Sequence, residues 1–244
     1  MPLHILLPGR SPAFPDDPAA LTPDRHGLVA IGGYLSPEII LESYRKGIFP
    51  WTGEHPIPWY SPDPRMILEP GEVRVTRSMR QVMRNRGFEV TYDTRFREVM
   101  AMCANIERPD QVGTWITPNM VRTWKRLHAM GYAHCVEVSL DGELVGGLYG
   151  IAIGRAFFGE SMAARVPNAS KVALITLCRA LARLGFHFID CQQSTSHLAR
   201  MGAFDVTRKE FLERLAMAVE QPDAWLGRGA PPDDAPFFLP DDAT

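Results

Sequence analysis

The sequence predicts an α+β protein in which helices flank a mixed β-sheet. Three observations carry this prediction: apolar runs of strand length, amphipathic runs with capping residues, and the order in which the two kinds alternate. Residues 1–64 are rich in proline and glycine around a single helix, whereas strands and helices interleave along residues 65–244. We therefore expect a small N-terminal domain over residues 1–64 and a larger domain over residues 65–244.

The first expected helix lies in the N-terminal domain. Ser36 is a good N-cap, Pro37 suits the first helical position, and Gly47 marks the end. The aromatic residues that follow, Trp51 and Trp59 among them, lie on proline-rich segments. Such residues are typical of a small core and also of a surface on which a nucleic-acid base stacks.

The larger domain begins with alternating helices and a strand. Thr76 opens the first helix and Thr117 caps the third, because a hydroxyl at the N-cap accepts a backbone N–H. Gly87 and Gly131 end the first and third helices. The expected elements are the helices 77–85, 94–105 and 119–130 and the strand 88–92.

A β-hairpin comes next, with strands at 133–140 and 144–153 around the turn at 141–143. A strand follows at 155–162, and Asn168 or Ser170 then starts a long helix that Gly185 closes. The strand 186–192 and helices near 195–201 and 207–219 complete the domain. This order gives a mixed sheet covered by helices.

Composition limits the class of protein. The chain has 244 residues, 45% of them hydrophobic and 22% charged, with a formal net charge of −2. It has no apolar run of about 18 residues, so we expect no membrane segment. The four cysteines have no metal-binding spacing, and residues 1–23 lack the pattern of a signal peptide. We therefore expect a cytoplasmic protein with reduced thiols and no metal.

Two acidic residues follow apolar strands, which is costly. Glu160 comes after Ala156-Phe157-Phe158-Gly159, and Asp190 comes after Phe186-His187-Phe188-Ile189. A buried carboxylate costs several kcal/mol unless it is paired or hydrogen-bonded. Strict alternation along the second strand places Asp190 and Gln192 on one face, where the acid can orient the amide. A functional pair and a structural polar cluster fit this pattern equally well.

A basic stripe lies at the start of the larger domain. Between residues 73 and 86 the chain has five arginines and only neutral residues otherwise. A local basic stripe on a nearly neutral protein suits a polyanion, and it also suits a solvated helix face. The five residues are Arg74, Arg77, Arg80, Arg84 and Arg86.

Several sequence blocks together resemble the leucyl/phenylalanyl-tRNA–protein transferase family. The N-terminal blocks are GLVAIGGYLSP at 27–37, YRKGIFPW at 44–51 and WYSPDPR at 59–65. The later blocks are GTWIT at 113–117, LVGGLYG at 144–150, GESM at 159–162, NASK at 168–171 and DCQ at 190–192. The resemblance extends over roughly residues 5 to 215, and the order and number of the blocks make it specific.

The resemblance implies a bacterial enzyme of the N-end rule pathway. Such an enzyme moves Leu or Phe, with Met as a further case, from aminoacyl-tRNA to the α-amine of proteins that begin with Arg or Lys. It implies a larger domain with the acetyltransferase-like (GNAT) fold, no metal and no organic cofactor. We expect a monomer in the cytoplasm that does not associate with a membrane.

The resemblance also assigns site residues. It implies that Asp190 orients Gln192 against the attacking amine and that Glu160 lies beside the acceptor or the aminoacyl group. It places Trp51 and Trp115 around the terminal adenosine of the tRNA. The apolar pocket for the amino acid is expected to include Leu148, Phe157, Leu177 and Leu181, and the five arginines of the basic stripe are expected to bind tRNA phosphates.

Two other functions were weighed against this one. An acyl-CoA-dependent N-acetyltransferase needs a glycine-containing pyrophosphate loop before a helix, and residues 163–168 contain no glycine. A non-catalytic tRNA-binding adaptor needs the tryptophans and arginines and does not need Asp190 or Gln192. One departure from the family pattern is Ala163-Ala164, where an aromatic residue and a serine are usual; we expect their loss to enlarge the site or to reduce activity.

Overall fold

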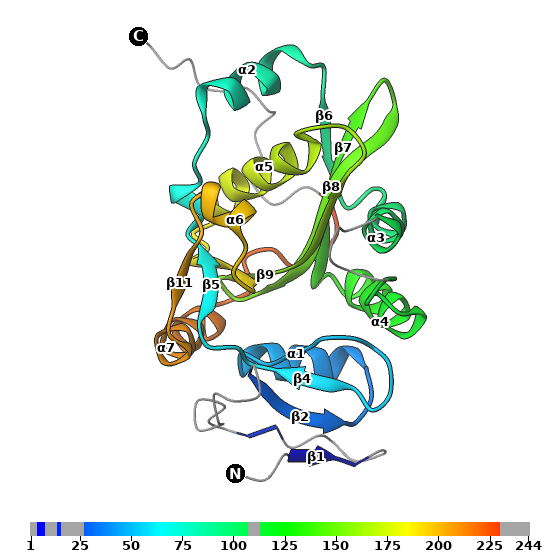
Figure 1. Cartoon of the computed structure of the whole chain (residues 1–244), viewed down its shortest axis with the longest axis vertical. Helices are drawn as coiled ribbons and strands as arrows, with labels where there is room; N and C mark the ends of the chain where they lie inside the picture. The colour runs from blue at the N-terminus through cyan, green and yellow to red at the C-terminus, as the bar shows by residue number, and fades with distance from the viewer. Residues whose placement is uncertain (1–3, 8–13, 16–26, 107–112, 230–244) are drawn as a thin grey trace.

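A computed structural model describes residues 4–7, 14–15, 27–106 and 113–229 (Figure 1). The described chain forms a four-stranded sheet of order β1-β2-β4-β3 and a seven-stranded sheet of order β11-β5-β10-β9-β8-β7-β6. Helices flank the larger sheet, so the predicted mixed α/β class is confirmed. None of the described helices has the length and apolar content needed to span a membrane.

The small sheet lies in the part of the chain where the sequence indicated only one helix. Its strands are short and interrupted by proline and glycine, so they show no clear alternation. Trp59, which lies on one of them, is fully buried and donates its Nε1–H to the carbonyl of Gly32 at 3.0 Å, so it is a core residue. The strands are β1 His4–Leu6, β2 Leu28–Gly32, β3 Phe49–Pro50 and β4 Pro58–Tyr60.

Helix α1 (Pro37–Arg45) packs on this sheet and begins as the sequence predicts. The Ser36 side chain accepts the N–H of Ile39 at 3.3 Å, and Pro37 occupies the first turn. The buried face of the helix includes Ile40 and Tyr44, of which Tyr44 points toward the larger sheet.

The larger sheet contains the predicted hairpin and two strands that the sequence did not indicate, β5 and β11. The pairs β6–β7, β7–β8 and β8–β9 are antiparallel. Strand β10 is parallel to β9 and antiparallel to β5. The parallel pair is connected through a crossover helix, α5 (Ala169–Arg183). The strands are β5 Arg65–Leu68, β6 Glu89–Tyr92, β7 Ala133–Leu140, β8 Glu143–Ile153, β9 Ala156–Ala164, β10 Phe188–Gln192 and β11 Phe204–Val206.

Two hydrophobic cores lie on the two faces of this sheet. One core contains side chains of α1, α3, α4 and α7, and the other contains side chains of α2 and α5. Figure 1 shows α5 and α6 on one side of the sheet and α3 and α4 on the other. The remaining helices are α2 Arg77–Asn85, α3 Phe96–Asn105, α4 Pro118–Ala129, α6 Ser196–Arg200 and α7 Arg208–Val219, with a short 3-10 helix, η3, at Pro70–Glu72.

Strands β9 and β10 part near their ends. They pair only through Phe188 with Ala156, Ile189 with Phe157 and Asp190 with Phe158. Beyond Asp190 the register of β10 against β5 shifts, and Gln192 has a φ of +64°. Beyond this point β9 and β10 are no longer paired, so backbone and side chains of both strands surround one opening.

Candidate active site

A cavity of about 570 Å³ lies where β9 and β10 part. Its apolar side is formed by β8, β9, β10, α5 and α6, and its other side by the loop after β3 and the segment before α4. Most of the expected site residues line this cavity. They are Trp51, Trp115, Leu148, Phe157, Glu160, Leu177 and Gln192, and they are joined by others such as Phe49, Tyr149, Leu174, Ile189 and Leu198.

Apart from the five arginines of the basic stripe, two expected residues do not line the cavity. Leu181 lies one turn beyond Leu177 on α5 and is buried in the core between that helix and the sheet, so it does not line this cavity, and its role at the aminoacyl site stays a prediction. Asp190 is also completely buried, behind the cavity wall, where it makes polar contacts with a residue that the sequence did not indicate.

That residue is Arg65, the first residue of β5. Its Nε donates to Oδ1 of Asp190 at 2.8 Å and its Nη2 donates to Oδ2 at 2.6 Å, which gives a bidentate pair. The guanidinium also lies between the rings of Phe49 and Phe211, with its Cζ 4.7 and 4.5 Å from the two ring centroids. Arg65 is 1% exposed, so ion pair and aromatic rings together replace its hydration.

Asp190 holds the backbone of Gln192. Its Oδ1 accepts the Gln192 N–H at 2.9 Å, across the register shift at the end of β10. The strict alternation expected for this strand is therefore wrong, because the left-handed backbone at Gln192 interrupts it. The Gln192 side chain belongs to the cavity together with Ile189 and Cys191, and the acid fixes the position of the amide through the main chain.

Glu160 has a different environment. Its Oε1 accepts a hydrogen bond of 2.5 Å from the hydroxyl of Tyr44, a residue of α1. Loss of water around the carboxyl and the nearby charge of Asp190 together raise the pKa of Glu160 to about 8, despite the lowering effects of the Tyr44 hydrogen bond and of Arg65. A carboxyl with this pKa is largely protonated at neutral pH, which weakens the expectation that its charge attracts a basic acceptor residue.

The two tryptophans lie at the rim of the cavity. Trp51 is 39% exposed, although its ring contacts Tyr60 at a centroid distance of 5.1 Å and stacks near Phe49 at 6.5 Å. Trp115 is half-buried in the segment that leads into α4. A large exposed aromatic surface at the mouth of an apolar cavity suits a planar ligand.

The basic stripe lies on and around α2, and none of its side chains lines the cavity. Arg74, Arg77, Arg84 and Arg86 are exposed. Arg80 is partly buried and donates its Nη1–H to the carbonyl of Val75 at 2.9 Å. The backbone N–H of Arg74 binds the carbonyl of Met201 at 2.8 Å, so the stripe begins beside α6, whose Leu198 belongs to the cavity wall.

Neither of the unusual alanines lines the cavity. Ala163 pairs with Gly147 and is buried, and Ala164 pairs with Gly146. On β9 the wall of the cavity extends to Met162 and stops there. Whether these alanines enlarge the site or reduce activity stays a prediction.

Comparisons with known proteins agree with the sequence blocks. The family model for leucyl/phenylalanyl-tRNA protein transferase matches residues 67–216, and the model for its N-terminal domain matches residues 33–63. The chain belongs to the leucyl/phenylalanyl-tRNA protein transferase family. The division into units at residues 64 and 65 stays a proposal about folding.

Relatives from several bacteria carry the family name, leucyl/phenylalanyl-tRNA–protein transferase. The protein from Azoarcus sp. (strain BH72) is 52% identical over 223 residues, which cover 90% of this chain and 94% of the relative. The protein from Thiobacillus denitrificans is 54% identical over 210 residues, which cover 86% of this chain and 91% of the relative.

Solved structures show a more distant similarity. A GCN5-related N-acetyltransferase from Kribbella flavida is 13% identical, with a TM-score of 0.37, and the match covers 68% of this chain and 58% of that one. The structure of L-PGS from Bacillus licheniformis is 12% identical, with a TM-score of 0.39, and the match covers 84% of this chain and 68% of that one.

Replacing Arg65 by Met should lower the free energy of unfolding by about 3–5 kcal/mol, because Asp190 would stay buried without its partner. Urea denaturation measures this loss. The matched control is Arg214→Met, which removes a partly exposed pair with Glu69 at 2.8 Å and should cost about 0–1 kcal/mol. Equal losses for the two variants would show that burial of the Arg65 pair is energetically unimportant.

Replacing Glu160 by Gln should change how stability depends on pH. The pKa of Glu160 is raised to about 8 in the folded protein, so the folded state holds a proton that the unfolded chain releases above its ordinary value of 4.5. This group therefore favours the folded state most at low pH. As pH rises from about 4.5 to about 8, the free energy of unfolding falls by at most about 1.4 kcal/mol per pH unit.

The stability of E160Q relative to wild type should therefore increase between about pH 5 and about pH 8. Urea denaturation at several pH values in this window measures the difference. Glu98→Gln is the control, because the Arg95 hydrogen bond lowers the pKa of Glu98 and removes it from the window. A difference between E160Q and wild type that stays constant with pH would contradict the raised pKa.

Proposed function

We propose that this chain transfers Leu or Phe from aminoacyl-tRNA to the N-terminal α-amine of proteins beginning with Arg or Lys, and that the cavity between β9 and β10 is the active site. Membership of the family makes the chain an aminoacyltransferase that uses aminoacyl-tRNA and protein substrates. The observation that carries the site assignment is one cavity that combines an apolar end, a pair of rim tryptophans and a fixed polar end. A monomer acting in the cytoplasm completes the proposal.

The apolar end suits the aminoacyl side chain. Leu148, Phe157, Leu174 and Leu177 provide only hydrocarbon and aromatic surface, so a Leu, Phe or Met side chain gains about 1.5–3 kcal/mol by leaving water there. A charged or strongly polar side chain would have no partner in this part of the cavity and would be rejected. Trp51 and Trp115 are then available to stack on the terminal adenine.

The polar end suits attack on the ester. The acceptor amine forms a bond to the ester carbonyl carbon, the bond to the ribose oxygen breaks, the amine loses a proton and the ribose oxygen gains one. Since an aminoacyl ester is already activated, positioning supplies most of what the reaction needs. The Gln192 amide, fixed through Asp190 and Arg65, is placed to orient the amine; it is too weak a base to remove the proton.

Glu160 is suited to handle the amine proton. An α-amine has an ordinary pKa of about 7.7–8.0, and the pKa of Glu160 is raised to about 8. Proton exchange between groups of matched pKa has almost no thermodynamic cost, so the ionised fraction of Glu160 can accept the proton of an arriving ammonium group and release it to the ribose oxygen. The hydrogen bond from Tyr44 keeps the carboxyl oriented for this exchange.

The basic stripe suits the tRNA backbone. It begins beside α6, next to the cavity, and continues along α2. Burial lowers the pKa of His197 on α6, and the positive charges of Lys171 on α5 and Arg200 on α6 lower it further, so these two residues add positive charge near α6. A basic path that leaves the cavity in one direction fits an RNA whose 3′ end enters it.

Purified protein should move labelled leucine and phenylalanine from their tRNAs to a peptide that begins with Arg. Gln192→Ala should lower kcat by about 10²-fold through loss of orientation, with little change in tRNA affinity. Gln221, which is exposed and does not line the cavity, provides the control Gln221→Ala. A wild-type chain that transfers neither amino acid would refute the proposal, and transfer of an acetyl group from acetyl-CoA to the same peptide would favour the acetyltransferase alternative.

Replacing Arg77, Arg80 and Arg84 together by Ala should weaken tRNA binding and reduce its dependence on salt. Each lost phosphate contact should reduce the slope of log K against log salt concentration by about 0.7–0.9. Filter binding at several salt concentrations measures the slope. The control replaces three exposed basic residues of α3 and α4, Arg97, Arg122 and Lys125; an equal loss of slope there would remove the stripe from the tRNA interface.

A further inference from the structure

The segment after α7 folds back over the large sheet and is fixed there by several hydrogen bonds. Asp223 Oδ1 accepts the N–H of Gly154 at 2.7 Å, and the N–H of Gly227 binds the carbonyl of Gly131 at 3.2 Å. The approach is close, since a Cβ at Gly131 would lie 2.4 Å from the Gly227 nitrogen. Residues 221–229 are therefore a built part of the fold, which we call the C-terminal strap.

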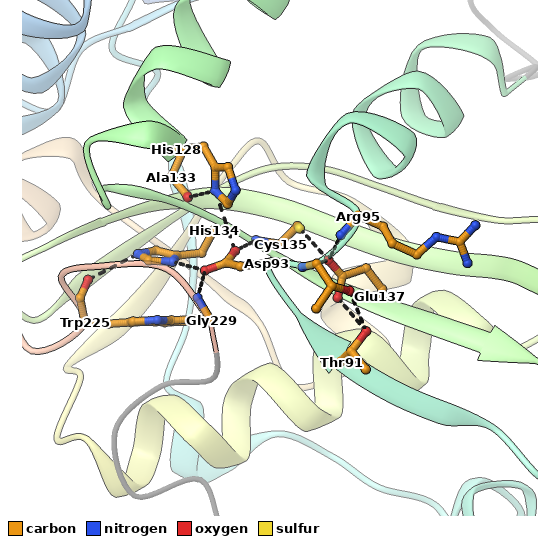
Figure 2. A network of polar contacts seen from close by, with 11 residues as sticks. Thr91, Asp93, Arg95, His128, Ala133, His134, Cys135, Glu137, Trp225 and Gly229 are labelled. Atoms are coloured by element: carbon orange, nitrogen blue, oxygen red, sulfur yellow. Dashed lines mark hydrogen bonds and ion pairs between the residues drawn. The ribbon is translucent and has the colours of Figure 1, made fainter. Parts of the chain in front are cut away.

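A buried polar network anchors the strap from the sheet side (Figure 2). Asp93 Oδ2 lies 2.8 Å from Nδ1 of His134 and accepts the N–H of Gly229 at 3.1 Å. The other ring nitrogen of His134 lies 3.2 Å from the carbonyl oxygen of Trp225. Both ring nitrogens of His134 therefore face acceptor oxygens, one on Asp93 and one on the strap.

This network fixes the ring of Trp225. The indole stacks on His134 at a centroid distance of 4.0 Å with an interplanar angle of 19°. On the sheet it stacks with Phe157 at 6.4 Å and 23°, and it is 1% exposed. Figure 2 shows the Trp225 and His134 rings lying one above the other.

Phe157 connects the strap to the cavity. Its ring is part of the cavity wall, yet it also lies against Gly150, where a Cβ would be 2.4 Å from its Cε1. The Phe157 ring is therefore confined by Gly150 and by Trp225, and it also borders the cavity. The position of this wall depends on a residue that does not itself line the cavity.

We propose that Trp225 is a specificity-determining positioning residue: it holds the Phe157 ring in place and thereby sets the depth of the pocket for the aminoacyl side chain. This inference rests on the proposed function, which places that side chain against Phe157. Trp225 lies beyond residue 216, where the family match ends, so the family resemblance assigns it no role.

The physical consequence of shortening Trp225 has a direction. Replacement by Phe leaves unfilled volume behind Phe157, and a core that can relax fills such a space partly by moving neighbouring rings into it. Withdrawal of the Phe157 ring deepens the cavity. The larger Phe side chain gains more from this than Leu does, so selectivity moves toward Phe.

The experiment compares Trp225→Phe with Trp124→Phe. Both tryptophans are almost fully buried, and neither indole N–H has a hydrogen-bond partner among the described residues, but Trp124 belongs to the core on the other side of the sheet. The same substitution therefore removes the same atoms in both places. The readout is the ratio of kcat/KM for Phe-tRNA to that for Leu-tRNA, with thermal unfolding as a measure of stability.

We expect W225F to raise this ratio by about fivefold and W124F to leave it within about twofold of wild type. If W225F does not fold at the assay temperature, Trp225→Tyr carries the same test with a smaller expected change. In the double variant with Phe157→Leu, the effect of W225F on the ratio should disappear, because the ring that Trp225 positions is gone.

The outcomes separate the two proposals. A wild-type chain that transfers neither amino acid overturns the proposed function, and this inference with it. A wild-type chain that is active, with W225F lowering transfer of Leu and Phe equally or leaving the ratio unchanged, overturns only the role of Trp225. An unchanged effect of W225F when Phe157 is already Leu would likewise overturn it.

Discussion

The ion pair between Arg65 and Asp190 is the interaction on which the site depends. It joins the first residue of β5 to the end of β10, and its guanidinium lies between Phe49 of the small sheet and Phe211 of α7. One buried contact therefore links three parts of the fold. Both oxygens of Asp190 bind the guanidinium and Oδ1 also accepts the Gln192 N–H, so the end of β10 is held in place, although Nη1 of Arg65 has no hydrogen-bond partner among the described residues.

The second carboxylate of the site is built in the opposite way. Glu160 is hydrogen-bonded to the neutral hydroxyl of Tyr44 and has no cation in direct contact, whereas both oxygens of Asp190 bind a guanidinium. The guanidinium of Arg65 compensates the burial of Asp190. Glu160 has no such partner among the described residues, and loss of water raises its pKa to about 8. Asp190, which is fully buried, thus becomes a permanent anchor, and Glu160, which is partly buried in the cavity wall, becomes a group able to exchange a proton near neutral pH.

The sequence predicted the elements that carry local signals. Ser36, Thr76 and Thr117 each accept a backbone N–H at a helix start, as their positions indicated, and the hairpin and crossover helix follow from apolar periodicity. Arg65 was missed, since its partner is distant in the sequence, and the strands of two to five residues in the N-terminal region are too short to show alternation. The position of Gln192 was predicted from a regular strand, and the left-handed backbone there has no signal in the residue type.

The cavity wall has a second layer that sequence patterns cannot indicate. Leu148, Phe157 and Leu177 were predicted from family blocks, and each is in direct contact with the cavity. The ring of Phe157 stacks with Trp225, which lies in residues 221–229. No periodic pattern in the sequence indicates this contact. Burying an indole N–H without a partner costs about 1–3 kcal/mol, so the aromatic surface against His134 and Phe157 must offset that cost. The Trp225 ring packs behind Phe157, and the Phe157 ring forms part of the cavity wall.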